Sequence, residues 1–492
     1  MGYSHGRIGE AELRDELERL GQSHVLRFWN ELEGHQREEL IAQLGSIRWD
    51  ELGAALAVAV QGTDGKAPEL PPLERLEPVV PWPRIADGLR AEQYARAQER
   101  AHEMLRAGSV GVLTVAGGQG SRLGFNGPKG AFPIGPVSGS SLFEGFAGAI
   151  RRASERHGRP IPWYIMTSPA NHAGTLDLFA SCGYFGLDPG NVRFFQQGQM
   201  PVVSRDGRIL LASKGRVAMA PDGHGGLLGA LAREGILDDW AARGVEVLSV
   251  FQVDNPLVRC VDPLFLGLHA ITRAEVSCKV VRKREDREGL GNLCWWDGRL
   301  VCIEYSDFPD AYATARGPDG ERRYTAGGIS VYVFSAAFLS RLAGRGDVLA
   351  WHRAVKRVAF VGDDGAIVEP AVPNAVKLER FLFDVLPHAR RPLVMWTRRE
   401  EEFSPVKNLE GVDSVESCRR DLVRRACAWL DKAGIAVPRA ADGEPDATIE
   451  ISPAFADSEE DLVARMSDRR VEVPRGGVWL VDGRSEPRAM AG

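Results

Sequence analysis

The chain has 492 residues, of which 44% are hydrophobic and 26% are charged, a composition typical of a folded protein of two or three domains. Its 61 basic and 67 acidic side chains give a formal net charge of −6, which argues against a general binder of nucleic acids or of membrane surfaces. No uninterrupted apolar run reaches the roughly 20 residues that span a bilayer.

The N-terminal part of the chain is predicted to be helical. Residues 9–58 have apolar side chains at helical spacing among many Glu, Leu and Arg residues, which predicts two or three amphipathic helices. Residues 62–83 are rich in Pro and Gly and predict an extended strap, because proline fixes φ and lacks an N–H donor. A further helix is predicted over residues 91–107. We therefore expect a helical N-terminal segment with a strap over residues 1–107.

From residue 109 onward, short β-rich segments alternate with helical patterns. Strands are predicted over residues 110–115, 163–168, 192–197, 245–254, 276–281 and 329–334. Helices are predicted over residues 141–157, 226–234, 263–273 and 377–386. Several of the strands are apolar on both faces, as buried parallel strands are. The alternation predicts an α/β fold with an open, mostly parallel central sheet, within a domain over residues 108–390.

After residue 397 the pattern weakens. A helix over residues 414–430 and short strands over 471–473 and 478–481 predict a small C-terminal α+β domain over residues 391–492. The seven cysteines are an odd number and never occur as CxxC, which predicts reduced thiols, mostly packed in cores. The first 20 residues contain no apolar segment, so we expect no secretory signal and a cytoplasmic protein.

The stretch LTVAGGQGSRLGFNGPKG joins the first central strand to a glycine-rich loop. Gly117, Gly118 and Gly120 have no side chains, so their N–H groups can approach a phosphate or nucleotide closely. Arg122 and Lys129 follow and supply two positive charges, which suits a nucleoside triphosphate. A Walker A loop needs Ser or Thr after the lysine, and a dinucleotide fingerprint needs its third glycine one residue earlier. The alternative is a glycine-rich turn with two solvated cations.

This loop resembles the signature of the UDP-sugar pyrophosphorylases, and especially of the UDP-N-acetylglucosamine (UDP-N-acetylhexosamine) pyrophosphorylases. Further blocks resemble that family in the same order, namely IPWYIMTS, YFGL, FFQQG, APDGHGGL, VDNPLV, EYS, AVKLERFLFDVL and EFSPVKN. The resemblance implies transfer of a uridylyl group from UTP to a sugar 1-phosphate, with release of pyrophosphate and with Mg²⁺ as cofactor. It also implies a Rossmann-like catalytic domain and small-molecule substrates, with no nucleic-acid or membrane partner. A monomer is the default expectation.

The resemblance also assigns roles to single residues. Asp254, at the end of an apolar strand, would bind Mg²⁺, an ion that takes oxygen ligands and keeps waters. Lys377, together with Arg122 and Lys129, would act on the phosphates during catalysis, and Lys407 would add a further phosphate contact. Each of these residues also has an ordinary alternative: Asp254 as a turn residue, Lys377 as an exposed lysine on a helix, and Lys407 as a loop lysine.

Nucleotide and sugar contacts follow from the same resemblance. Uracil would be bound by the amide of Gln196, which can donate and accept together, and by backbone groups of glycines. The nucleotide-binding set is Gly117, Gly118, Gly120, Gln196 and Gly223. The sugar-binding set is His224, Gly291, Glu304 and Gly328. The alternatives are a strand-edge glutamine and a solvated carboxylate at Glu304.

Two positions depart from the family pattern. The family has GNGG where this chain has His224 after Gly223, and it has asparagine after Ala-Gly where this chain has Gly328. Both asparagines lie near the sugar in the family, so the sugar identity stays open between N-acetylglucosamine, N-acetylgalactosamine, glucose and galactose. A UDP-glucose or broad-specificity pyrophosphorylase is therefore an alternative, as is a non-catalytic UDP-sugar-binding protein. A dehydrogenase is disfavoured by the glycine spacing.

Overall fold

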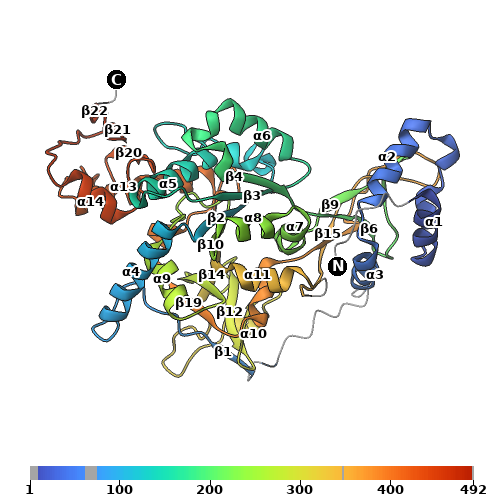
Figure 1. The fold of residues 1–492 in the computed structure, drawn as a ribbon, viewed down its shortest axis with the longest axis horizontal. Coiled ribbons are helices and arrows are strands. Elements are labelled where there is room, and N and C mark those ends of the chain that lie inside the picture. The colour runs from blue at the N-terminus through green and yellow to red at the C-terminus, as the bar shows by residue number, and fades with distance from the viewer. Residues whose placement is uncertain (1–8, 61–71, 73–74, 346–347, 490–492) are drawn as a thin grey trace. The chain divides into compact units, whose positions relative to one another are not determined.

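Residues 9–60, 72, 75–345 and 348–489 are described by a computed structural model of the chain, which is drawn in Figure 1. The chain divides into two compact units, each assembled from separated segments. The helical unit comprises residues 1–70, 197–230 and 344–384, and the sheet unit comprises residues 71–196, 231–343 and 385–492. The boundaries of these units do not coincide with the predicted domain boundaries at residues 107 and 390. The division into three consecutive domains stays a prediction.

Three helices open the helical unit, as the apolar periodicity of residues 9–58 predicts. They are α1 (Glu10–Arg19), α2 (Gly34–Gly45) and α3 (Trp49–Val60). Each buries one apolar face, and Leu17, Leu44 and Leu52 are at most 1% exposed. These faces share a hydrophobic core with several of the short strands of the same unit. The strands are β5 (Gln199–Pro201), β6 (Val203–Ser204), β7 (Leu211–Ser213), β8 (Arg216–Val217), β9 (Met219–Pro221), β15 (His352–Lys356), β16 (Phe360–Val361), β17 (Ile367–Val368) and β18 (Ala375–Glu379).

The segment around Lys377 is a strand, and the helix predicted over residues 377–386 is wrong. In β18, Lys377 lies between Val376 and Leu378, which are fully buried, whereas Lys377 itself is partly exposed. This alternation is that of a half-buried strand, and β18 pairs antiparallel with β15 and with β6. A 3-10 helix follows only at Leu382–His388. Sheet pairing within the helical unit therefore overrides the helical pattern of this segment.

The sheet unit is built on a ten-stranded mixed sheet. Its strands are β1 (Leu76–Pro78), β2 (Val110–Val115), β3 (Trp163–Thr167), β4 (Val192–Gln196), β10 (Val247–Gln252), β11 (Val276–Arg282), β12 (Gly291–Trp296), β13 (Arg299–Ile303), β14 (Ala326–Ser335) and β19 (Pro392–Trp396). The order is β1-β12-β14-β10-β2-β3-β4; in addition β13 pairs with β12, and β11 pairs with β14 and β19. The strands β10, β2, β3 and β4 are parallel neighbours. The predicted α/β class with a large central sheet is confirmed, and all six predicted strands are present.

Helices cover both faces of this sheet. The helices of the sheet unit outside its C-terminal part are α4 (Ala91–Ala107), α5 (Leu142–His157), α6 (His172–Ser181), α8 (Ile236–Arg243), α9 (Pro263–Ile271), α10 (Asp310–Ala313) and α11 (Ala336–Ala343). Helix α7 (Leu227–Arg233) runs across the boundary between the two units. On one face, Phe146 of α5 contacts Phe251 of β10, with ring centroids 5.1 Å apart. On the other face, Trp240 of α8 contacts Tyr164 of β3 at 5.9 Å. Successive strand residues point to opposite faces, so the neighbouring Trp163 belongs to the α5 side.

The C-terminal part of the sheet unit has a small hydrophobic core of its own. Its elements are α12 (Arg399–Glu402), α13 (Val415–Lys432), α14 (Glu459–Met466), β20 (Ala447–Ile451), β21 (Gly477–Val481) and β22 (Arg488–Ala489). Leu430, Ile449 and Trp479 lie in that core. The predicted helix and the predicted strand at residues 478–481 are present as α13 and β21. The strand predicted over residues 471–473 is wrong, because β21 pairs with β20 and the segment runs into Pro474, which lacks a donor for a ladder.

Part of the predicted strap, residues 61–71 and 73–74, lies outside the described residues. Where the structure resumes, β1 pairs antiparallel with β12. Five of the seven cysteines are buried, Cys302 is partly exposed, Cys182 is exposed, and all are free thiols, which confirms the prediction. Among the described residues, no helix is both long enough and apolar enough to cross a membrane.

Candidate active site

Several predicted site residues meet at one edge of the central sheet. Because β2, β3, β4 and β10 are parallel, their carboxyl ends lie at the same edge, where ligands bind in open α/β sheets. Gly117 lies two residues beyond β2, Gln196 ends β4, and Asp254 lies two residues beyond β10. Strand β14 runs antiparallel to β10, which brings its beginning, with Gly328, to this edge as well.

Hydrogen bonds from the protein fix the backbone of the glycine loop after β2. The side-chain amide of Asn171 donates to the carbonyl oxygens of Ala116 (2.8 Å) and Gly118 (3.0 Å). The N–H of Lys129 also donates to Gly118 (3.1 Å). Within the described chain, no acceptor takes the N–H groups of Gly117 and Gly118. Hydrogen bonds within the protein thus hold the carbonyl groups of Ala116 and Gly118. The N–H groups of Gly117 and Gly118 are available to a phosphate or to a carbonyl group of a ligand.

Lys129 faces Asp254 at the same edge. Lys129 Nζ lies 3.6 Å from a carboxylate oxygen of Asp254, and each side chain is only 14% exposed. Burial lowers the pKa of Lys129; the charge of Asp254 opposes this shift, and the charges of Lys407 and Arg122 add to it. The charges of Lys407 and Arg122 are therefore close enough to interact with that of Lys129, which itself faces Asp254. Such a cluster suits a polyphosphate ligand.

Lys407 reaches this cluster from the C-terminal part of the sheet unit. The N–H of the preceding residue, Val406, donates to the carbonyl oxygen of Asp254 (2.8 Å), which ties the two segments together. Lys407 Nζ itself lies 3.4 Å from a carboxylate oxygen of Asp413. Arg122 is exposed in the glycine loop. The structure thus brings the predicted phosphate-binding residues of the sheet unit together.

Gly130 directly follows Lys129 and packs against the buried ring of Phe143. A Cβ atom at Gly130 would lie 2.0 Å from that ring. We therefore expect Gly130→Ala to lower the free energy of unfolding by about 1–3 kcal/mol, because the methyl group overpacks the core. Denaturant unfolding monitored by circular dichroism measures this. Gly145→Ala in α5 is the control: its methyl group meets open space, so stability should rise by about 0.5–1 kcal/mol, and equal effects of the two substitutions would contradict the packing argument.

The predicted sugar-binding residues of the sheet unit also converge. Gly291 of β12 and Gly328 of β14 are a cross-strand pair. Glu304 directly follows the β13 residue that pairs with Asn292. A Cβ atom at Gly328 would lie 2.7 Å from Cδ1 of Leu293, so a side chain at this position would require Leu293 to move. Two strands thus present bare backbone here, and Glu304 follows the neighbouring residue pair of the sheet.

Gly223, His224 and Lys377 belong to the helical unit and are described within it. Gly223 has φ +83°, a conformation that favours glycine. Nδ1 of His224 accepts the N–H of Leu382 (2.9 Å), so the neutral ring carries its proton on Nε2. The ring also stacks on Phe381, with centroids 5.3 Å apart. His224 therefore holds the segment that follows the strand of Lys377, and the ligand-binding roles of these three residues stay predictions.

Two asparagines that the sequence analysis did not single out hold the backbone of the site. Asn171 is 2% exposed and braces the glycine loop as described above. Asn255 is 3% exposed and hydrogen-bonds the segment that leads to Lys407. Both lie a few residues beyond a parallel strand, at the ligand-binding edge. That position is the only signal in the sequence that could have identified them.

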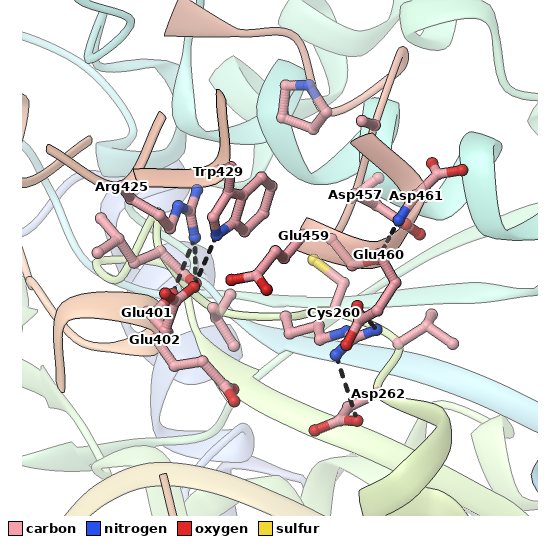
Figure 2. Close-up of a pocket in the computed structure, with 18 of the residues that line it drawn as sticks. Cys260, Asp262, Glu401, Glu402, Arg425, Trp429, Asp457, Glu459, Glu460 and Asp461 are labelled. Atoms are coloured by element: carbon pink, nitrogen blue, oxygen red, sulfur yellow. Dashed lines mark hydrogen bonds and ion pairs between the residues drawn. The ribbon is translucent and has the colours of Figure 1, made fainter. Parts of the chain in front are cut away.

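A cavity of about 820 Å³ lies elsewhere in the sheet unit, beside its C-terminal part (Figure 2). Its lining includes Pro256, two residues after Asp254, and Trp429. It contains none of the predicted site residues. The guanidinium group of Arg425 in its wall is already bound to the carbonyl oxygens of Leu257 (2.8 Å) and Glu401 (3.0 Å). The glycine-loop edge, and not this cavity, is therefore the candidate active site.

The parallel sheet edge, the available N–H groups of the loop and the cationic side chains beside Asp254 suit the site of a nucleotidyltransferase. Residues 82–429 match the family described as UTP–glucose-1-phosphate uridylyltransferase. The chain belongs to this family, which confirms the resemblance seen in the sequence.

Individual relatives extend over most of the chain. The human UDP-N-acetylhexosamine pyrophosphorylase-like protein 1 is 37% identical, over 94% of this chain and 96% of the human protein. The UDP-N-acetylglucosamine diphosphorylase 1 of Arabidopsis thaliana is 32% identical, over 94% of this chain and 92% of its own length. The crystal structure of the uridine diphosphate N-acetylglucosamine pyrophosphorylase from Trypanosoma brucei, in complex with an inhibitor, has a similar fold (TM-score 0.78, 24% identity, 96% of this chain and 99% of that chain).

Proposed function

We propose that the protein transfers the uridylyl group of UTP to an N-acetylhexosamine 1-phosphate, preferring N-acetylglucosamine 1-phosphate, and releases pyrophosphate. The observation that carries this proposal is the pairing of Lys129 with Asp254, with the charges of Arg122 and Lys407 close enough to act on Lys129, beside a loop with available N–H groups. These cations would offset the negative charges of two phosphate-bearing substrates. The names of the human and plant relatives support the choice of an N-acetylhexosamine.

In the proposed reaction a phosphate oxygen of the sugar phosphate attacks the α-phosphorus of UTP. The bond from that phosphorus to the bridging oxygen breaks, and pyrophosphate leaves with the electron pair. The protein forms no covalent bond, so its contribution is positioning and the stabilisation of negative charge. Lys129 and Arg122 would bind the phosphates of UTP, and Lys407 would bind those nearer the sugar. For Lys377, in the helical unit, a phosphate contact stays a prediction. The backbone of Gly117 and the amide of Gln196 would hold the base.

Mg²⁺ fits this site as an ion shared with the substrates. In the parts of the chain that the structure describes, no group of three or more His, Cys, Asp or Glu side chains could hold a metal. Asp254 supplies a single, largely buried carboxylate beside the phosphate-binding cations. Mg²⁺ is commonly bound by one or two carboxylates together with substrate phosphates, and it would neutralise phosphate charge there. Asp254 is thus the residue of this chain that would hold it.

A broad-specificity UDP-sugar pyrophosphorylase is the second candidate. It is favoured by Gly328, which offers no side chain to the sugar, and by His224, whose Nδ1 is already bound to the backbone of Leu382. A site with fewer hydrogen-bonding groups discriminates less between sugars, because a mismatched substrate leaves fewer buried groups unpaired. The monomeric state and the cytoplasmic location stay predictions under either function.

The two candidates are separated by a panel of sugar 1-phosphates. Pyrophosphate release is measured with UTP, Mg²⁺ and the 1-phosphates of N-acetylglucosamine, N-acetylgalactosamine, glucose and galactose. We expect the highest kcat/KM with N-acetylglucosamine 1-phosphate, at least about 10-fold above glucose 1-phosphate, because one recognised group contributes roughly 1–3 kcal/mol. Similar kcat/KM values across the panel would support the broad-specificity enzyme. No release with any sugar, while UDP-sugar still binds, would indicate a non-catalytic binding protein.

A further inference from the structure

The turn that carries Asp254 is joined to the segment before Lys407 by three hydrogen bonds. The side chain of Asn255 donates through Nδ2 to the carbonyl oxygen of Glu402 (2.7 Å) and accepts the N–H of Ser404 through Oδ1 (3.2 Å). The carbonyl oxygen of Asp254 accepts the N–H of Val406 (2.8 Å). Because Asn255 uses both ends of its amide on one segment, it sets the register between the two chain segments.

The segment that Asn255 binds is itself rigidly held. The carboxylate of Glu402 accepts hydrogen bonds from the fully buried Lys279 and from Thr397 (2.7 Å). Lys279 Nζ also lies 2.7 Å from Asp262, which ends the same turn region at the start of α9. Figure 2 shows Glu402 and Asp262 as separate parts of the wall of the neighbouring cavity. The stretch from Asn255 to Asp262 is thus anchored at both ends.

Asn255 has no direct route to the substrates. It is 3% exposed, and both ends of its amide are bound to backbone groups. Its neighbour Asp254 points to Lys129, and the segment beyond Ser404 leads directly to Lys407. A displaced turn would therefore change the separation between the carboxylate and the cations without removing any of these groups.

We propose that Asn255 is a positioning residue for uridylyl transfer, which acts by holding Asp254 in register with Lys407. This proposal rests on the proposed function, since it takes Asp254 and Lys407 as contacts of the metal-bound nucleotide and the sugar phosphate. Misplacement of a reacting group by about 1 Å can cost roughly 100-fold in rate. Asn255 therefore contributes to kcat through geometry, beyond any contribution to stability.

The test compares Asn255→Leu with a matched variant of a second buried amide. Leucine has a similar shape and removes both hydrogen bonds. Gln22, in the helical unit, is 5% exposed and likewise binds one segment with both ends of its amide, donating to Gly207 (3.0 Å) and accepting from Ile209 (2.9 Å); its Nε2 also donates to Leu20 (3.3 Å). We expect Asn255→Leu and Gln22→Met to lower Tm by similar amounts. Only Asn255→Leu is expected to lower kcat, by about 10- to 100-fold, with the KM for the sugar 1-phosphate changed less than about three-fold.

A second measurement keeps the proposal testable apart from activity. UTP binding is followed by calorimetry with and without Mg²⁺. In Asn255→Leu the metal-free affinity should stay near the wild-type value, while the additional affinity that Mg²⁺ confers should be reduced. If Asn255→Leu does not fold, Asn255→Asp replaces it, because it keeps the side-chain shape and the acceptor for Ser404 but loses the bond to Glu402. The same fall in kcat and in Mg²⁺-dependent affinity is expected for it.

The outcomes separate the two proposals. Asn255 variants that match Gln22→Met, with a lower Tm but wild-type kcat and Mg²⁺-dependent UTP affinity, would overturn the positioning role. Failure of the wild-type protein to release pyrophosphate with any sugar would overturn the proposed function, and the Mg²⁺-dependent binding of UTP would still decide the role of Asn255.

Discussion

Lys129→Met is expected to lower kcat for pyrophosphate release about 100- to 1,000-fold at saturating substrates, the range seen when a preorganised electrostatic group is lost. Methionine keeps the apolar stem of the side chain but removes a charge that lies 3.6 Å from Asp254. That charge is needed most when the bond to the leaving pyrophosphate breaks. Initial rates of pyrophosphate release measure the effect.

The pH dependence of pyrophosphate release tests whether Lys129 is the group responsible for this loss. Burial lowers the pKa of Lys129, with Asp254 opposing the shift and Lys407 and Arg122 adding to it. The protonated lysine is the active form, so activity falls as pH rises through this lowered pKa, and the fall begins at a lower pH than for an ordinary lysine. Lys129→Met should lack this basic limb. Lys432→Met, at the exposed end of α13, is the control with unchanged rates, and similar activity of both variants would rule out the role.

Asp254→Asn is expected to lower kcat/KM about 100- to 1,000-fold, and higher Mg²⁺ concentrations should not restore it. Asparagine keeps the shape of the side chain but cannot offer a charged oxygen ligand to the metal. The change also removes the charge that raises the pKa of Lys129, so residual activity should be lost at a lower pH than in the wild type. Initial rates over a grid of Mg²⁺ concentration and pH measure both effects.

Asp188→Asn is the matched control for that substitution. Asp188 is an exposed N-cap whose carboxylate accepts the N–H of Gly190 (2.9 Å), and asparagine caps equally well. Its kinetics and Tm should stay close to those of the wild type. An Asp254→Asn protein with wild-type dependence on Mg²⁺ would show that the metal is held without this carboxylate.

Short-range patterns predicted most of the secondary structure correctly. The strand at residues 110–115 and the helix at residues 91–107 are found with the predicted bounds, because each is a strongly patterned segment whose ends carry their own signals. Gly108, for example, ends α4 in the left-handed conformation at φ +77°. Lys377 shows the limit of such patterns. The apolar residues around Lys377 fit either a helix or a strand. Pairing with β15 and with the distant β6 decided for the strand.

The candidate site shows the same division. The glycine loop, Lys129 and Asp254 were found from the sequence because strand ends and bare backbone are local features. The bracing by Asn171 and Asn255 was not predicted, since an asparagine after a strand is also a common turn residue. Only the hydrogen-bond partners of the side chain distinguish a bracing asparagine from an ordinary turn residue. Here these partners are the carbonyl oxygens of Gly118 for Asn171 and of Glu402 for Asn255.

The sequence by itself determined the family, the alternation of strands and helices, and the chemical groups available to bind phosphates. These properties depend on the types of residues that lie close together in the sequence. They can therefore be recognised without knowing which distant segments pack against them. The tertiary structure alone decided that Lys407 shares the electrostatic environment of Lys129, and that the Asp254 turn is bound to residues 402–406. Those contacts join segments far apart in the chain, and they form only because the C-terminal part packs beside the end of β10 and brings them together.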